Sequence, residues 1–91
     1  MPDARAGAPA PWLLLSRPDC HLCEAFEEAL QAHLGAALPP LERACVDARG
    51  EWRMRYGQRI PVLLDADGRV LAEGVFEPAD FERARRGPGL C

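Results

Sequence analysis

Two cysteines separated by two residues are the part of this sequence best suited to chemistry. Cys20 and Cys23 flank a His-Leu dipeptide, a few residues after a short apolar run and at the start of a helical pattern. Such a pair can exchange disulfides with other thiols, or it can supply two of the four ligands of a zinc site. A position between a strand and a helix is typical of redox-active pairs. The surrounding sequence must therefore distinguish the two chemistries.

The other two cysteines give little support to the zinc alternative. A four-cysteine site would need Cys45 and Cys91 to converge on the pair, yet neither belongs to a second C-x-x-C motif. Cys45 falls within a predicted strand and is expected to be a small buried apolar residue. Cys91 is expected to be an exposed thiol. We therefore predict a redox pair and no metal, and a metal-binding module is kept as the weaker alternative.

Length and composition indicate one globular domain. The 91 residues suffice for one modest core, and the net charge of −3 argues against a nucleic-acid binder. No stretch approaches the ~20 apolar residues of a membrane-spanning helix. The apolar run at 12–15 is also shorter than the core of a usual signal peptide. We predict a cytoplasmic monomer with a domain at 12–86, a disordered tail at 1–11 and a C-terminal tail at 87–91.

The elements that must position the pair alternate along the chain in the order β-α-β-α-β-β-α. Strands are expected at 12–16, 41–47, 62–64 and 69–72. Helices are expected at 20–34, 49–56 and 79–85. Asp19 is the predicted N-cap of the first helix, and Asp67-Gly68 is a strong hairpin signal between the last two strands. A right-handed crossover makes the first two strands parallel. The expected α/β fold is a four-stranded mixed sheet with helices on both faces.

With these elements in place, the chain resembles the glutaredoxins, the compact branch of the thioredoxin-fold superfamily. It is most similar to a group of short bacterial glutaredoxin-like proteins. The matching parts are the strand at 12–16, the segment 17–24, Tyr56-Gly57, the segment 60–63, the Asp67-Gly68 turn and Gly74. The resemblance implies a thioredoxin-like fold and thiol–disulfide oxidoreductase activity. It also implies a cis peptide bond between Ile60 and Pro61, in a turn that lies against the active-site sulfurs.

The expected roles of the two cysteines differ. Cys20 lies in the first turn of the predicted helix, where free backbone N–H groups and the helix dipole favour a thiolate. Arg17 would favour the thiolate further, and Asp19 would oppose it. Cys20 is therefore the predicted nucleophile, and Cys23 is the residue that resolves the mixed disulfide. The residues expected to contact the substrate are Arg17, His21, Leu22, Ile60 and Pro61.

Two departures from the family pattern concern glutathione. The chain has Arg59 before Ile60-Pro61, where glutathione-binding glutaredoxins usually have Thr-Val-Pro, and it lacks their Gly-Gly-x-Asp segment at 72–76. No cofactor is predicted, and glutathione stays open as a co-substrate. The expected partners are a protein or small-molecule disulfide and a cellular reductant, either glutathione or a thioredoxin-reductase-type system. A non-catalytic redox sensor or adaptor is the alternative function.

A basic cluster lies near the predicted active edge. It consists of Arg49, Arg53, Arg55 and Arg59, on and beside the second predicted helix. These arginines are either a solvated helix face or a docking surface for an acidic partner or a carboxylate. Trp52 and Tyr56 are expected to pack the same helix onto the sheet.

Overall fold

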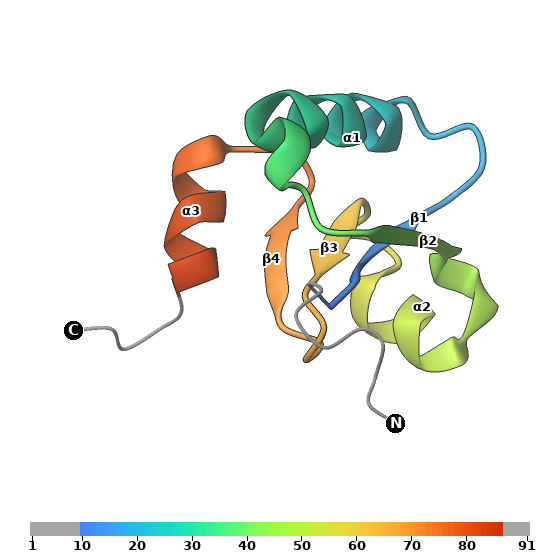
Figure 1. Ribbon diagram of the computed structural model, residues 1–91. Helices are drawn as coiled ribbons and strands as arrows, with labels where there is room; N and C mark the ends of the chain where they lie inside the picture. Colours follow the sequence, from blue (N-terminus) through green and yellow to red (C-terminus); the bar gives the residue numbers. More distant parts are fainter. Residues whose placement is uncertain (1–9, 87–91) are drawn as a thin grey trace.

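Four strands form one mixed sheet in the spatial order β2-β1-β3-β4 (Figure 1). The computed structural model describes residues 10–86. The strands are β1 (Trp12–Ser16), β2 (Leu41–Cys45), β3 (Val62–Leu64) and β4 (Val70–Glu73). The helices are α1 (His21–Leu34), α2 (Gly50–Tyr56) and α3 (Pro78–Arg86), with short 3-10 turns at Gly35–Ala37 and Val46–Ala48. The predicted order of elements is confirmed.

The strand β1 lies at the centre of the sheet and sends neighbouring side chains to opposite faces. Leu14 and Leu15 are both buried, and they belong to two separate core clusters. Because side chains alternate along a strand, one apolar run can supply both clusters. β1 pairs with β2 in parallel, and β3 pairs with both β1 and β4 in antiparallel fashion. The predicted parallel crossover and the predicted hairpin are both confirmed.

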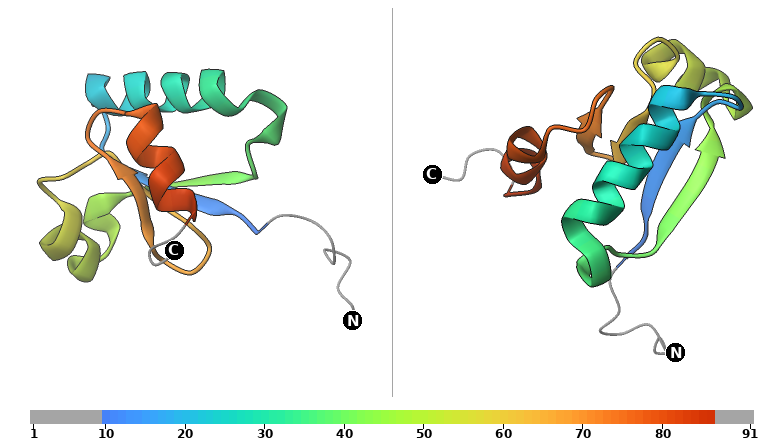
Figure 2. Two further views of the ribbon diagram at one scale, coloured as in Figure 1. Left: turned by 90° about the vertical axis from the view of Figure 1, so that its left-hand side faces the viewer. Right: turned by 90° about the horizontal axis from the view of Figure 1, so that it is seen from above.

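Helices cover both faces of the sheet, as predicted (Figure 2). On one face, Phe26 and Leu30 of α1 and Phe81 of α3 pack against Leu14 and Leu63 of the sheet. On the other face the cluster includes two residues of the second helix, the buried Tyr56 and the partly buried Trp52. The expected packing of α2 by these two aromatic side chains is therefore confirmed, and the arrangement is a thioredoxin-like fold.

Most element boundaries lie within one residue of the prediction, and two differences bear on the packing and the site. β2 ends at Cys45, and Val46 begins a 3-10 turn in which its side chain is fully buried. The apolar character of Val46 therefore reflects burial beneath α2 and not a longer strand. The second difference is the N-cap of α1, which belongs to the candidate site. The predicted tail at 1–11 and the predicted tail at 87–91 lie almost wholly outside the described residues.

None of the helices within residues 10–86 has the length and apolar character needed to cross a membrane.

Candidate functional site

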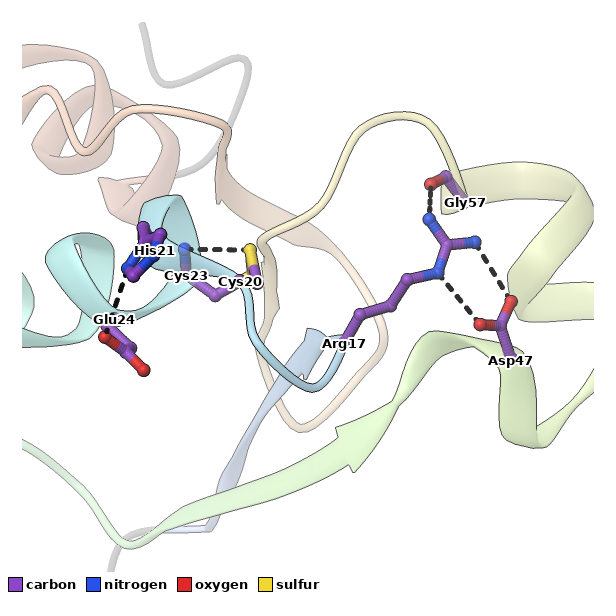
Figure 3. Close-up of a disulfide and its surroundings, with 7 residues drawn as sticks. All are labelled: Arg17, Cys20, His21, Cys23, Glu24, Asp47 and Gly57. Carbon is purple, nitrogen blue, oxygen red and sulfur yellow. Dashed lines mark hydrogen bonds and ion pairs between the residues drawn. A yellow bond between two sulfur atoms is a disulfide. The ribbon is translucent and has the colours of Figure 1, made fainter.

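Cys20 and Cys23 are joined by a disulfide at the start of α1 (Figure 3). Their Cα atoms are 5.2 Å apart, because one helical turn brings residues three positions apart to the same side. The backbone N–H of Cys23 donates a hydrogen bond to Cys20 Sγ over 3.1 Å. Cys20 Sγ therefore accepts one of the free N–H groups that every helix N-terminus presents.

The N-cap of α1 is Cys20, so the prediction of Asp19 in this role is wrong. Cys20 has extended backbone angles, with its side chain bonded to the third residue beyond it, which is the geometry of a cap. Asp19 instead has a φ of 59° and completes the turn before the helix. An aspartate tolerates this left-handed conformation better than most residues do. The Cys20 sulfur thus takes the place that a capping carboxylate would otherwise occupy.

The two sulfur-bearing residues differ in exposure. Cys23 is 6% exposed and belongs to the buried residues of α1, whereas Cys20 is partly exposed. The intervening His21 and Leu22 are both exposed, and Leu22 remains 45% accessible. An incoming molecule would therefore reach Cys20, His21 and Leu22 before it reached Cys23.

The Ile60–Pro61 peptide bond is cis, as the family resemblance implies. Pro61 is buried, and its carbonyl accepts a hydrogen bond from Gly74 N–H over 2.8 Å. The antiparallel register pairs Leu15 with Val62, so the residue before Val62 lies beside the end of β1. The chain leaves β1 at this same edge to reach Cys20. The sheet register thus brings the cis turn and the cysteine loop to one end of the molecule.

Arg17 points away from the disulfide and ties the cysteine loop to the opposite side of the sheet (Figure 3). Its guanidinium binds both carboxylate oxygens of Asp47, over 2.8 and 3.0 Å. It also donates to the carbonyl of Gly57, at the end of α2, over 2.8 Å. This hydrogen bonding lowers the pKa of the Asp47 carboxyl below its usual range. In this geometry Arg17 positions the loop, because its guanidinium is bonded to Asp47 and Gly57 and points away from both sulfurs.

Replacing Asp47 by Asn should weaken this tie in a pH-dependent way. Because the pKa of Asp47 is lower in the folded chain, its carboxylate stabilises the fold above the ordinary aspartate pKa of about 3.9. That contribution disappears as the pH falls through the folded-state pKa. We expect D47N to lower the urea midpoint at pH 7, and we expect the difference from the wild type to shrink as the pH falls below about 3.9. Glu28→Gln, at an exposed position of α1, is the control. Equal midpoints for D47N and the wild type at pH 7 would contradict this account.

Two carboxylates that the sequence reasoning missed lie beside the pair. Glu24 and Glu27 line a shallow pocket together with Cys20 and Cys23. Glu27 is also ion-paired with Arg43 of β2, and its side chain is 22% exposed. The spacing would have indicated this position, since Glu27 lies one helical turn beyond Cys23.

Cys45 is partly exposed, so the prediction of a buried residue is wrong. It is the last residue of β2 and lies opposite Ser16 in the parallel register. The end of a strand leaves its side chain covered on fewer sides than the middle does. Among residues 10–86, no three His, Cys, Asp or Glu side chains gather as a metal site would require. Cys91 lies outside the described residues.

Two solved structures are similar to this chain over most of its length. A structure of protein XcR50 from X. campestris has 32% sequence identity and a TM-score of 0.64, covering 85% of this chain and 99% of that one. The solution structure of protein Ne2328 from Nitrosomonas europaea has 26% identity and a TM-score of 0.70, covering 85% and 91%. No curated protein matches the chain.

The family assignment follows from the whole folded segment. The model of the Glutaredoxin-like domain (DUF836) matches residues 12–86, from the first residue of β1 to the last residue of α3. The matched segment includes the cysteine pair, the cis turn and every element of the sheet. The chain therefore belongs to the glutaredoxin-like domain family.

Proposed function

We propose that the protein is a thiol–disulfide oxidoreductase that uses Cys20 and Cys23 as its dithiol. The observation that carries the proposal is the unequal setting of the two bonded cysteines. Cys20 is partly exposed and accepts a helix N–H, whereas Cys23 is buried one turn further along. A helix N-terminus favours a thiolate, typically by about 0.3–1 kcal/mol. The accessible sulfur is therefore also the one better suited to attack.

The proposed cycle moves two electrons from the protein to a substrate disulfide. The Cys20 thiolate attacks one substrate sulfur, the substrate S–S bond breaks, and the first substrate thiolate leaves and takes up a proton. Cys23 then loses its proton and attacks Cys20 Sγ. The second substrate thiolate leaves, and the protein holds the Cys20–Cys23 disulfide. The net products are two substrate thiols and one oxidised protein, which a cellular dithiol or two monothiols must reduce again.

The substrate would approach over the exposed residues around Cys20. His21 and Leu22 project from the first turn of α1, and Ile60 is partly exposed beside the cis turn. We assign these residues, with Pro61, to substrate contact. Arg17 is assigned to positioning of the cysteine loop, because its guanidinium is held by Asp47 and Gly57.

The proposal needs no bound cofactor. The reductant is either glutathione or a thioredoxin-reductase-type system, and the substrate is a protein or small-molecule disulfide. We further propose that the protein acts as a monomer in the cytoplasm, where reductants of this kind keep thiols reduced.

The test is a stoichiometric exchange reaction. Reduced protein is mixed with a peptide disulfide, and mass spectrometry follows both partners. The expected result is one peptide disulfide converted to two thiols for each Cys20–Cys23 disulfide formed. Equilibration with glutathione buffers then gives the reduction potential, with about −270 mV typical of thioredoxin and about −200 to −230 mV typical of glutaredoxins. A dithiol form that leaves peptide disulfides intact would refute the proposal.

A further inference from the structure

We infer that the exposed side of α2 docks an acidic segment of the disulfide-bearing partner, an inference that rests on the proposed function. We call this surface the α2 face, and it consists of Arg49, Arg53, Met54 and Arg55. All four residues are exposed. The α2 face would thus select the protein whose disulfide Cys20 attacks.

The first argument is the separation of charge along the chain. Residues 49–59 contain four arginines and one glutamate, a net charge of +3, although the whole chain carries −3. The rest of the protein is therefore strongly acidic. A local field opposite in sign to the molecule as a whole steers acidic partners to one place, and it repels them elsewhere.

The second argument is that the charges of the α2 face are free to bind. Arg59, just beyond the helix, is held by Glu73, and Arg17 is held by Asp47. Within residues 10–86, by contrast, the three arginines of the α2 face make no ion pair, and the Arg53 charge acts on Asp47 only at longer range, as a minor cause of its lowered pKa. An arginine guanidinium presents planar pairs of N–H donors that match a carboxylate. The surface therefore offers unused donors for aspartate and glutamate side chains.

The third argument is that aromatic rings support two of these arginines. The Arg49 guanidinium lies 5.0 Å from the centre of the Trp52 ring, and that of Arg55 lies 5.8 Å from the Tyr56 ring. A supported guanidinium loses less freedom when it binds, so binding costs less free energy. Between them Met54 is 87% exposed. A long apolar side chain among cations suits a partner segment that carries apolar as well as acidic residues.

The fourth argument is position. The segment between β2 and β3 begins at Val46 and ends at Pro61, and the register places both points at the edge of the sheet where β1 ends. The disulfide lies beyond that same edge, and Arg17 connects its loop to Gly57 at the end of α2 (Figure 3). We therefore expect a segment bound to the α2 face to extend toward the edge of the sheet where Cys20 lies.

The binding test uses a fluorescent peptide without cysteine, in which Glu and Asp alternate with Leu. Fluorescence anisotropy is measured with the oxidised protein. We expect Arg49→Glu combined with Arg53→Glu to weaken binding about tenfold or more at low salt, within the range expected for steering by several charges. The matched control is Arg83→Glu combined with Arg86→Glu on α3, which packs on the other face of the sheet. Arg53→Gln alone, with a smaller loss expected, is the milder variant if the double variant does not fold.

Several outcomes would overturn the inference. One is that the acidic peptide and a Ser/Gly peptide bind equally well. Another is that the α2 and α3 variants lose the same amount of peptide binding. A third is that a single-stranded oligonucleotide binds more tightly than the acidic peptide. The last outcome would assign the α2 face to nucleic acid instead. Self-association that disappears in the α2 variant would assign it to a second copy of the chain.

A kinetic comparison separates this inference from the proposed function. Reduced protein is given peptide disulfides with acidic or neutral flanking residues. Faster reduction of the acidic peptide than of the neutral one would support both ideas. This difference in rate should disappear at about 0.5 M salt, because salt screens exposed charges. Equal rates for both peptides would support the oxidoreductase activity and refute the docking surface. If neither disulfide is reduced but the acidic peptide still binds, the proposed function fails and the α2 face remains a binding surface.

Discussion

Cys20→Ser is expected to abolish disulfide exchange. The substitution replaces the only accessible sulfur of the pair by a hydroxyl, which is not a nucleophile toward disulfides near neutral pH. The serine can still cap α1, because its oxygen accepts the Cys23 N–H as well as Cys20 Sγ does. We therefore expect a folded protein whose rate falls to that of the uncatalysed reaction. The measurement is the rate of peptide disulfide reduction, with circular dichroism to verify the fold.

Cys23→Ser should give a different defect, since the attack by Cys20 remains. A substrate with two linked cysteines would stay joined to Cys20 as a mixed disulfide, visible as an added mass. Cys45→Ser serves as the control for a general loss of thiols, and full activity is expected. Reduction of the peptide at an unchanged rate by Cys20→Ser would remove the proposed mechanism. If Cys20→Ser were active and Cys45→Ser were inactive, the nucleophile would be Cys45 of β2.

The architecture follows from local sequence patterns because short continuous apolar runs mark the strands that are buried on both faces. The pairs Leu14 and Leu15 in β1 and Leu63 and Leu64 in β3 each send neighbouring side chains to different faces. Such strands require cover on both sides, and the amphipathic α1 and aromatic α2 supply it. The strand order and the parallel pair then follow from the connections.

The candidate site is less readable, because its details depend on contacts between distant segments. The Arg17 guanidinium lies against Asp47 and Gly57, which are 30 and 40 residues away. The sequence near Arg17 does not distinguish an arginine that lies beside a thiolate from one that connects two loops. Asp19 and Cys20 are likewise both plausible N-caps from sequence. The positive φ of Asp19 places it in the preceding turn, so that Cys20 becomes the cap.

Leu22 illustrates why the helical period alone does not decide burial. Its spacing places it on the same side of α1 as Phe26 and Leu30, yet it is 45% exposed whereas they are buried. Among the described residues, Leu22 belongs to neither of the two core clusters, although Cys23 beside it is buried. An apolar side chain kept at this place is consistent with the substrate contact proposed for it.

Phe26→Ala should strongly destabilise the fold. The Phe26 side chain is 1% exposed, and its ring meets that of Phe76 edge to face at a centroid distance of 5.5 Å. Truncation of a buried phenylalanine typically costs about 3–5 kcal/mol, which combines lost transfer energy and the remaining cavity. Small domains have only about 5–15 kcal/mol of stability. The measurement is urea unfolding of the oxidised protein, for which we expect a large fall in midpoint or no cooperative transition.

Leu22→Ala is the matched control, because it removes an apolar side chain one turn earlier on the same helix. Its exposed position predicts a stability change within about 0.5 kcal/mol, the usual range for surface substitutions. The same variant should slow the reduction of peptide disulfides, since Leu22 is proposed to contact the substrate. The two substitutions therefore separate packing from recognition along one face of α1. If Leu22→Ala destabilised the chain as much as Phe26→Ala while leaving its exchange rate unchanged, Leu22 would belong to the core and not to the site.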